Sequence, residues 1–179
     1  MTATSMPTLG FVGLGHMGGA MAGRLLVAGH RMHGTSRTRS RADHLVSAGL
    51  CWHDTPRQVA EAADVVLTSI PDDDALKAVA SGRDGVLSGL AAGAIWVEMS
   101  TVSPQASRDL AVHVGARGAR MLDAPVSGSV PQARAGTLTI MVGGDKAAVF
   151  EVLEHLTPRL PTAHSATPVG NRTRRKATS

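Results

Sequence analysis

The sequence predicts an α/β domain with a doubly wound, mostly parallel sheet that has helices on both of its faces. Short apolar segments typical of strands alternate along the chain with segments typical of helices, which is the arrangement of βαβ units. A glycine-rich turn follows the first expected strand and opens the first expected helix. With 179 residues, the chain is long enough for one domain with a substantial core and short for two.

Each expected element has its own local signal. The strands, which are apolar or alternating runs, are expected at residues 8–12, 31–36 (weak), 64–70, 94–99, 120–123 and 137–142. The helices are expected at residues 17–27, 39–48, from 56, after 71, 104–114 and 145–156. Thr55 and Ser103 are suited to N-caps because their side-chain oxygens can accept hydrogen bonds from the first turn, and the proline that follows each of them suits the first helical position. Asp72, Asp73 and Asp74 would form the acidic first turn of their helix.

A glycine motif follows directly after the first expected strand, and it reads Gly13-Leu14-Gly15-His16-Met17-Gly18. Gly13 permits a tight turn, Gly15 lets the backbone approach a pyrophosphate, and Gly18 allows close packing of helix on sheet. The phosphates would lie at the N-terminus of the next helix, where free N–H groups and the helix dipole favour anions. A strand before the motif and a helix after it favour dinucleotide binding over a purely structural turn.

The residues after the second expected strand favour NADP over NAD. An NAD enzyme usually has an acidic residue ~20 residues beyond the glycine motif to bond the ribose 2′-hydroxyl. Here the first acid after the motif is Asp43, and the segment Ser36-Arg37-Thr38 lies where that acid would be expected. Hydroxyls and a guanidinium suit a 2′-phosphate, since arginine can bind phosphate oxygens through two parallel hydrogen bonds. Arg39 and Arg41 are interpreted as solvated helix residues.

Two further strand ends are candidates for contact with the cofactor. Ile70-Pro71 and Ser100-Thr101 each end an expected strand, and open α/β sheets bind ligands at the carboxyl ends of their strands. The two hydroxyls would be able to bond ribose, carboxamide or substrate. A structural role is equally compatible, because Pro71 can simply end its strand and one hydroxyl can cap the next turn.

Together these segments resemble the β-hydroxyacid dehydrogenases, a group that includes 3-hydroxyisobutyrate dehydrogenases, tartronate semialdehyde reductases and the cofactor domain of 6-phosphogluconate dehydrogenase. The glycine motif is similar to the family's N-terminal signature, and residues 36–38 are similar to its NRT element. Residues 98–104 resemble its strand-end hydroxyl motif. The most specific segment, Asp123-Ala124-Pro125-Val126-Ser127-Gly128-Ser129, is similar to its DAPVSGG substrate segment. Ser129 departs from the usual second glycine, which affects local backbone freedom.

The resemblance implies a Rossmann-type fold and hydride transfer between NADP, or alternatively NAD, and a small 3-hydroxy acid or semialdehyde. It implies that Ser127, Gly128 and Ser129 bind the substrate, and that Thr101 places nicotinamide against the reacting carbon. The family's catalytic lysine, which exchanges a proton with the substrate oxygen, falls on Lys176 by counting. The residues around Lys176 do not match the family pattern.

The family also has a C-terminal helical domain that completes the substrate pocket and forms the dimer, and this sequence has no counterpart of it. We therefore expect residues 1–165 to form the NAD(P)-binding domain and residues 166–179 to form a basic, disordered tail. As a truncated form, the chain is expected to bind NADP(H) and to be weakly active or inactive. A non-catalytic dinucleotide-binding module and an imine-reductase-like enzyme are the alternatives.

Charge and composition argue against other functions. The net charge of +4 equals the charge of four residues near the C-terminus, Arg172, Arg174, Arg175 and Lys176. With only 2% aromatic residues there is little to stack bases on, so no nucleic-acid partner is expected. No apolar run reaches the ~20 residues that span a membrane, and no secretory signal is visible, so a cytoplasmic protein is expected.

Cysteine and histidine usage predicts neither a disulfide nor a metal site. Cys51 is the single cysteine, and it is expected to be a small core or strand residue in a reducing compartment. His30 and His33 lie three residues apart, and on a strand they would point to opposite faces. No histidine has metal-ligand spacing with a cysteine or an acidic residue, so no metal is expected.

Overall fold

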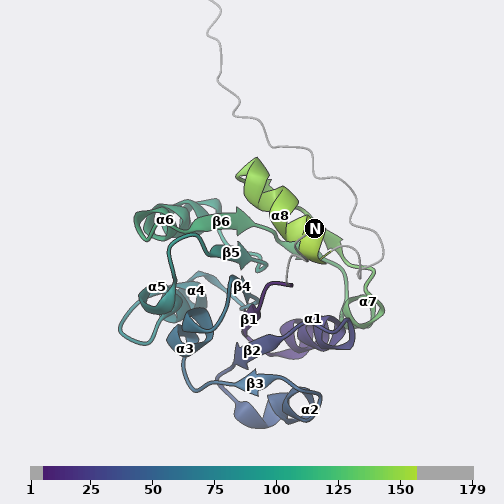
Figure 1. Cartoon of the computed structure of the whole chain (residues 1–179). Coiled ribbons are helices and arrows are strands. Elements are labelled where there is room, and N and C mark those ends of the chain that lie inside the picture. The colour runs from purple at the N-terminus through teal and green to yellow at the C-terminus, as the bar shows by residue number, and fades with distance from the viewer. Residues whose placement is uncertain (1–5, 157–179) are drawn as a thin grey trace, which may run out of the picture.

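The computed structural model describes residues 6–156, and its centre is a seven-stranded sheet in the order β3-β2-β1-β4-β5-β6-β9 (Figure 1). Every neighbouring pair is parallel except β6 and β9, which are antiparallel. The strands are β1 (Leu9–Val12), β2 (Met32–Thr35), β3 (Cys51–Trp52), β4 (Val65–Thr68), β5 (Ile95–Glu98), β6 (Arg120–Asp123) and β9 (Gly143–Gly144). The chain winds outward from β1 to β3 and then returns to the other side of β1, so the predicted doubly wound fold is confirmed.

Helices cover both faces of this sheet (Figure 1). One face is covered by α1 (His16–Val27), α2 (Asp43–Ser47), α7 (Val130–Ala135) and α8 (Lys146–Leu156). The other face is covered by α3 (Pro56–Glu61), α4 (Asp73–Ala80), α5 (Val86–Gly89) and α6 (Pro104–Ala116). A 3₁₀ turn, Arg39–Ala42, precedes α2. Two short strands, β7 (Val126–Ser127) and β8 (Thr139–Ile140), form a separate antiparallel pair.

The core consists of two apolar clusters, one on each face of the sheet. Successive side chains of a strand point to opposite faces, so Phe11 of β1 packs toward α1 while Val12 packs toward α3 and α4. Likewise Leu67 belongs to the first cluster, and Val66 and Trp96 belong to the second. Because both faces are covered, the central strands are apolar at nearly every position, which explains their continuous apolar runs in the sequence.

Two of the predicted helix starts have the expected caps, and at a third an aspartate that was expected in the first turn is the cap instead. The Thr55 side chain accepts a hydrogen bond from the Gln58 backbone N–H, and Pro56 opens α3. Asp72 caps α4 by accepting from the Ala75 N–H at 2.8 Å, so it lies just before the acidic first turn. Ser103 caps α6 in the same way. These local signals therefore located the helices correctly.

Other elements differ from the prediction. The expected helix over 39–48 is divided into the 3₁₀ turn and α2, and the expected strand over 137–142 is reduced to β8. Five short elements were not predicted: β3, α5, β7, α7 and β9. Cys51 was expected to be a core or strand residue, and it lies in β3, where its side chain is exposed rather than in the core.

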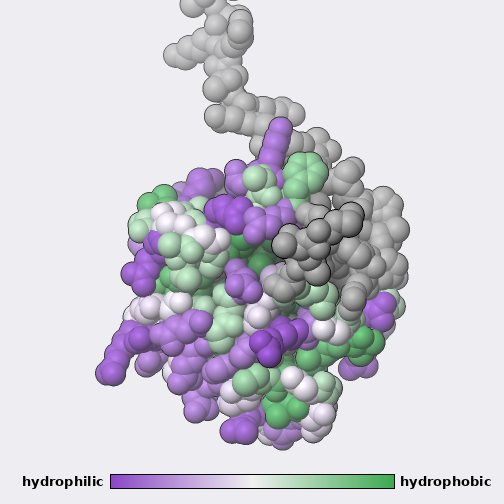
Figure 2. All heavy atoms as spheres, in the orientation of Figure 1, coloured by the Kyte–Doolittle hydropathy of each residue, from purple (hydrophilic) through white to green (hydrophobic). Residues whose placement is uncertain are grey.

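The surface has no single dominant chemical character in the view of Figure 2, where hydrophilic and hydrophobic residues are interspersed. The large hydrophobic side chains that are exposed include Val27, Val112 and Phe150, which belong to three different helices. Isolated exposed residues of this kind are normal for a folded protein. No helix among the described residues combines the length and the apolar character needed to cross a membrane.

Candidate functional site

The glycine motif forms the turn between β1 and α1, and its three glycines have different surroundings. Gly13 has φ +99°, and a Cβ there would lie 2.2 Å from the Ser69 carbonyl oxygen. A Cβ at Gly18 would lie 2.0 Å from the Gly13 carbonyl oxygen. A Cβ at Gly15, by contrast, would have no atom within 4 Å. Gly13 and Gly18 are thus required by the packing of the turn, whereas Gly15 adjoins open space.

The open space at Gly15 lies at the N-terminus of α1. Gly15 is the N-cap, no side chain caps this helix, and its first turn has no acidic residue. The amides of the first turn of a helix have no partners within the helix, and with the helix dipole they favour an anion. The residues present therefore fit a pyrophosphate. Leu14 is buried in the core and faces the site only through its backbone, whereas His16 is exposed and Met17 is half-buried.

The expected 2′-phosphate segment lies next to this turn. The Gly13 N–H donates to the Thr35 carbonyl at 3.0 Å, which joins the glycine turn to the end of β2. Directly beyond, Ser36 is half-buried while Arg37 and Thr38 are exposed. Among the described residues, Arg37 takes part in no ion pair, so its guanidinium is available to an anion.

The neighbouring arginines of this segment differ from the expectation in one respect. Arg39 was expected to be only solvated, but its guanidinium lies 5.7 Å from the centre of the Trp52 ring. This distance is typical of a cation–π contact, which fixes the segment after β2 to β3. Arg41 is exposed, as expected.

The ends of β4 and β5 are joined by Ser100. Its Oγ accepts a hydrogen bond from the Ile70 N–H at 2.8 Å, and its own N–H donates to Glu98 Oε1 at 2.8 Å. Ser100 is buried, whereas Thr101 and Pro71 are exposed. Of the two hydroxyls considered for ligand contact, that of Ser100 therefore holds two strand ends together, and that of Thr101 is accessible.

Glu98 is a buried carboxyl that the sequence reasoning missed. Burial raises its pKa, and the hydrogen bonds that it accepts from Ser100 and Thr68 oppose that rise. The Thr68 hydroxyl donates to Glu98 Oε2 and accepts from Trp96 Nε1–H, the latter at 2.9 Å. A signal was present in the sequence, because Glu98 ends an otherwise apolar strand and two hydroxyl residues follow it. Glu98 organises the carboxyl ends of β4 and β5.

The expected substrate segment follows β6. Asp123, the last residue of β6, is half-buried, and burial raises its pKa. Ser127, Gly128 and Ser129 are all exposed. Gly128 has φ +143°, which favours glycine, whereas Ser129 has φ −118°, which any residue adopts.

Ser129 has a structural function where the family pattern has glycine. Its backbone N–H and its hydroxyl both donate to Gln132 Oε1, at 2.8 and 2.9 Å, and so they begin α7. The departure from glycine at this position therefore causes no backbone strain. Because α7 packs against α1, the substrate segment lies on the same side of the sheet as the helix of the glycine turn (Figure 1).

The strand ends named above therefore share one edge of the sheet. In a parallel sheet all carboxyl ends meet at one edge, which here carries the glycine turn, Arg37, Thr101 and the segment 127–129. Lys176 lies outside the described residues. Lys77 and Lys146 are exposed on α4 and α8, as expected for solvated side chains.

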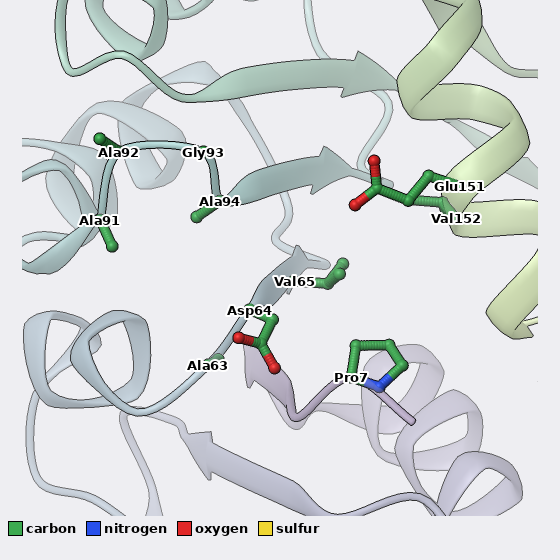
Figure 3. A pocket seen from close by; sticks show the side chains of 10 residues that line it. All are labelled: Pro7, Ala63, Asp64, Val65, Ala91, Ala92, Gly93, Ala94, Glu151 and Val152. Atoms are coloured by element: carbon green, nitrogen blue, oxygen red, sulfur yellow. The ribbon is translucent and has the colours of Figure 1, made fainter. Parts of the chain in front are cut away.

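A cavity of about 480 Å³ lies at the opposite edge of the sheet, where β4 and β5 begin (Figure 3). Its two acidic side chains have partners, because Asp64 accepts from the Thr8 N–H at 2.8 Å and Glu151 forms an ion pair with Arg120 at 2.8 Å. Most of the remaining lining residues are alanine, glycine or valine. The cavity is thus remote from the carboxyl edge and offers a ligand little specific recognition.

Comparison with known proteins gives consistent matches. Residues 8–160 match the protein family described as the NAD binding domain of 6-phosphogluconate dehydrogenase. The NAD-dependent L-serine dehydrogenase of Pseudomonas aeruginosa is 40% identical over 144 residues, covering 80% of this chain and 48% of that protein. The 2-hydroxy-3-oxopropionate reductase of Escherichia coli is 44% identical over 148 residues, covering 83% of this chain and 50% of that protein.

A solved structure shows the same likeness. The 3-hydroxyisobutyrate dehydrogenase of Mycobacterium tuberculosis, solved with L-serine, has a TM-score of 0.80 and is 31% identical. The match covers 86% of this chain and 52% of that chain. This chain therefore spans about half the length of the relatives that it matches.

Proposed function

This chain belongs to the family of the NAD-binding domain of 6-phosphogluconate dehydrogenase, and from that premise we propose that it binds NADP(H) and presents it to a small 3-hydroxy acid or semialdehyde. The observation that carries the proposal is the glycine turn. Gly13 and Gly18 are enclosed by backbone, while Gly15 adjoins open space at an uncapped helix N-terminus. This combination leaves room for a pyrophosphate and supplies donors for it.

The described residues would share the binding of the dinucleotide. The first-turn amides of α1 would hold the pyrophosphate, and Ser36, Arg37 and Thr38 would hold the 2′-phosphate. The backbone at Ile70 and Pro71 lies at the end of β4, beside β1, and would line the ring-binding part of the site. A bound nicotinamide dinucleotide supplies or accepts a hydride.

The substrate would be oriented by the exposed groups at the ends of β5 and β6. Ser127 and Gly128 offer a hydroxyl and a backbone N–H to a carboxylate, with Ser129 beside them. Thr101 would help to place the reacting carbon. These groups are all exposed, so the described residues do not by themselves exclude water from a substrate.

The proton donor is not assigned to a described residue. Lys176 matches the family's lysine by position alone, and we propose it for this role only on that ground. We expect the chain to bind dinucleotide firmly. Because the described substrate groups are open to solvent, we expect it to reduce 3-oxo acids slowly. Rapid, steady turnover of a 3-oxo acid by the purified chain would contradict this expectation.

The two alternatives differ in what they require. A non-catalytic dinucleotide-binding module would bind NADP(H) with no turnover of any 3-oxo acid, however long the assay. An imine-reductase-like enzyme would reduce cyclic imines in preference to oxo acids. The hydroxy-acid assignment is favoured by the segment 123–129 and by the accessible hydroxyl of Thr101.

The preference for NADP is tested by Arg37→Ala. Loss of a charge-assisted contact with the 2′-phosphate is expected to weaken NADPH binding by about 10- to 100-fold, while NADH binding changes little. Nicotinamide fluorescence titration measures both affinities. Arg41→Ala is the matched control, because Arg41 is also an exposed arginine of this segment. Equal losses for NADPH and NADH, or none for either, would exclude Arg37 as the residue that selects NADP.

A further inference from the structure

Three potential metal ligands meet on one face of the sheet at the β2–β3 edge. His33 of β2 is paired in register with Cys51 of β3. His53 follows Cys51 by two residues, so the alternation of an extended chain places both side chains on the same face. Nitrogen atoms of His33 and His53 and the sulfur of Cys51 all lie within 4.8 Å of one another. Strand pairing thus brings together residues that are up to 20 positions apart in the sequence and that form no recognisable metal-binding motif.

The two imidazoles of this cluster face each other closely. His33 Nδ1 lies 2.8 Å from His53 Nε2, and the ring centroids are 5.0 Å apart. The face in question is opposite to the one where Gly34 packs against Leu14 and Leu50. His33 and His53 are half-buried and Cys51 is exposed, so an ion can reach the cluster from solvent.

The chemistry of this donor set is that of a zinc site. We propose that His33, Cys51 and His53 bind one Zn²⁺ ion, with the fourth position open to water. Two imidazoles and one thiolate are ligands that Zn²⁺ prefers, and sites with three protein ligands retain an open position. No ion is present in the structure, and the site is a new assignment that does not depend on dinucleotide binding.

The two imidazole nitrogens need only a small adjustment to accept the ion. Two nitrogens in tetrahedral positions on zinc, at bonds of about 2.0–2.1 Å, are about 3.3 Å apart. The separation here is 2.8 Å, so the two rings would need to move apart by roughly half an ångström.

Zinc binding would have a structural consequence at this edge. β3 has only two residues and pairs with β2 alone, so it is held weakly within the sheet. An ion shared between His33 on β2 and Cys51 and His53 on or beside β3 would join the two strands. Only the folded chain brings the three ligands together. The ion would therefore bind the folded chain more tightly than the unfolded chain, and so it would also stabilise the fold.

The test is a metal titration of the full, untagged chain. We expect one Zn²⁺ per chain in competition with a chromogenic chelator. With Co²⁺ as the probe, we expect a thiolate-to-cobalt charge-transfer band, which can arise only from Cys51 because the chain has one cysteine. Cys51→Ser, His33→Asn and His53→Asn should each weaken Zn²⁺ binding by more than about 100-fold, since even the loss of a residue behind a ligand costs 10- to 100-fold.

His44→Asn is the matched control, because His44 is an exposed histidine on α2, away from the cluster. It should leave the affinity for Zn²⁺ unchanged. Circular dichroism checks that each variant is folded, and if His33→Asn does not fold, the variants at the exposed Cys51 and at His53 still decide the question. A second measurement is the rate of Cys51 alkylation, which Zn²⁺ should slow in the unmodified chain but not in His53→Asn.

Two results would overturn the proposal. The first is Zn²⁺ binding of equal strength in the unmodified chain, Cys51→Ser and His53→Asn, which would place the ion elsewhere. The second is no Zn²⁺ binding above the competition of the chelator, with Cys51 alkylated at the same rate in its presence. In that case the contact between His33 and His53 is simply a hydrogen bond.

Discussion

At the scale of single residues, Thr68 and Glu98 show how a buried polar group can shape a ligand edge. Glu98 is fully buried and is bonded by Thr68 and by Ser100, which in turn holds the Ile70 N–H. The loop after β4 and the loop after β5 therefore share one hydrogen-bonded network. Such a network is stabilising when every member is satisfied and costly when one member is removed.

Thr68→Val is expected to destabilise the protein strongly although it changes the shape of the side chain little. It removes the donor to Glu98 Oε2 and the acceptor of Trp96 Nε1–H, and so leaves two buried groups without this partner. Each unsatisfied group costs about 1–3 kcal/mol, so the free energy of unfolding should fall by about 2–6 kcal/mol. Urea denaturation of both chains measures this free energy.

Thr139→Val serves as the control, because Thr139 is a strand threonine with an exposed side chain. Its effect should stay within about 0.5 kcal/mol. If both variants lose the same free energy, the hydroxyl of Thr68 has no special function in the network.

The residues of the candidate site were predictable from the sequence to different degrees. Gly13, Gly15 and Gly18 were expected, because a glycine motif between a strand and a helix has a specific physical purpose. The different functions of Ser100 and Thr101 were not expected, since the sequence does not show which of two neighbouring hydroxyls is buried. The cluster of His33, Cys51 and His53 was missed because strand pairing, rather than sequence spacing, creates it.

At the scale of elements, the turn between β1 and α1 depends on the close approach of helix and strand. Gly18 lies on α1 directly above the backbone of the turn, where a Cβ would meet the Gly13 carbonyl oxygen and the Phe11 ring. No side chain can move to relieve the contact with the carbonyl. The helix would have to shift away from β1 to admit any larger residue.

Gly18→Ala is therefore expected to lower the free energy of unfolding by about 1–3 kcal/mol, the cost of overpacking. Gly23→Ala on the same helix is the matched control, because a Cβ there would have only Leu45 Cδ2 near it, at 3.4 Å. Alanine is the better helix former, so this variant should gain about 0.5–1 kcal/mol. Thermal unfolding followed by circular dichroism compares the two. Similar stabilities would contradict the packing described for Gly18.

The elements that escaped prediction are short ones. β3 and β9 have two residues each, and α5 has four, so none of them is long enough to show a periodic pattern. The central strands and α1, α4 and α6 are longer and have apolar runs or caps, and these were predicted. Short edge elements instead depend on what packs or pairs beside them, which is tertiary information.

At the scale of the whole molecule, the sheet has its topological switch between β1 and β4, where the chain reverses its direction of winding. In open α/β sheets this point marks the ligand crevice at the carboxyl edge. The glycine turn, the Arg37 segment, the Glu98 network and the segment 127–129 all border that edge. The cavity of Figure 3 lies at the other edge of the sheet, away from these groups.

The central claim is that open space at Gly15 receives the pyrophosphate of a dinucleotide, and Gly15→Val tests it most directly. Gly15 has an ordinary extended backbone, φ −74° and ψ −162°, and no atom would lie within 4 Å of a Cβ there. The variant should therefore fold, with a stability loss of at most about 1 kcal/mol at this N-cap. Its side chain would occupy the space of the phosphates.

The measurement is a fluorescence titration of the unmodified chain and Gly15→Val with NADPH, beside a denaturation curve for each. We predict that NADPH affinity falls by more than about 100-fold, which is roughly 2.8 kcal/mol of binding free energy, while both chains unfold cooperatively at similar denaturant concentrations. Equal NADPH affinity in the two chains, or no binding by the unmodified chain, would contradict the account.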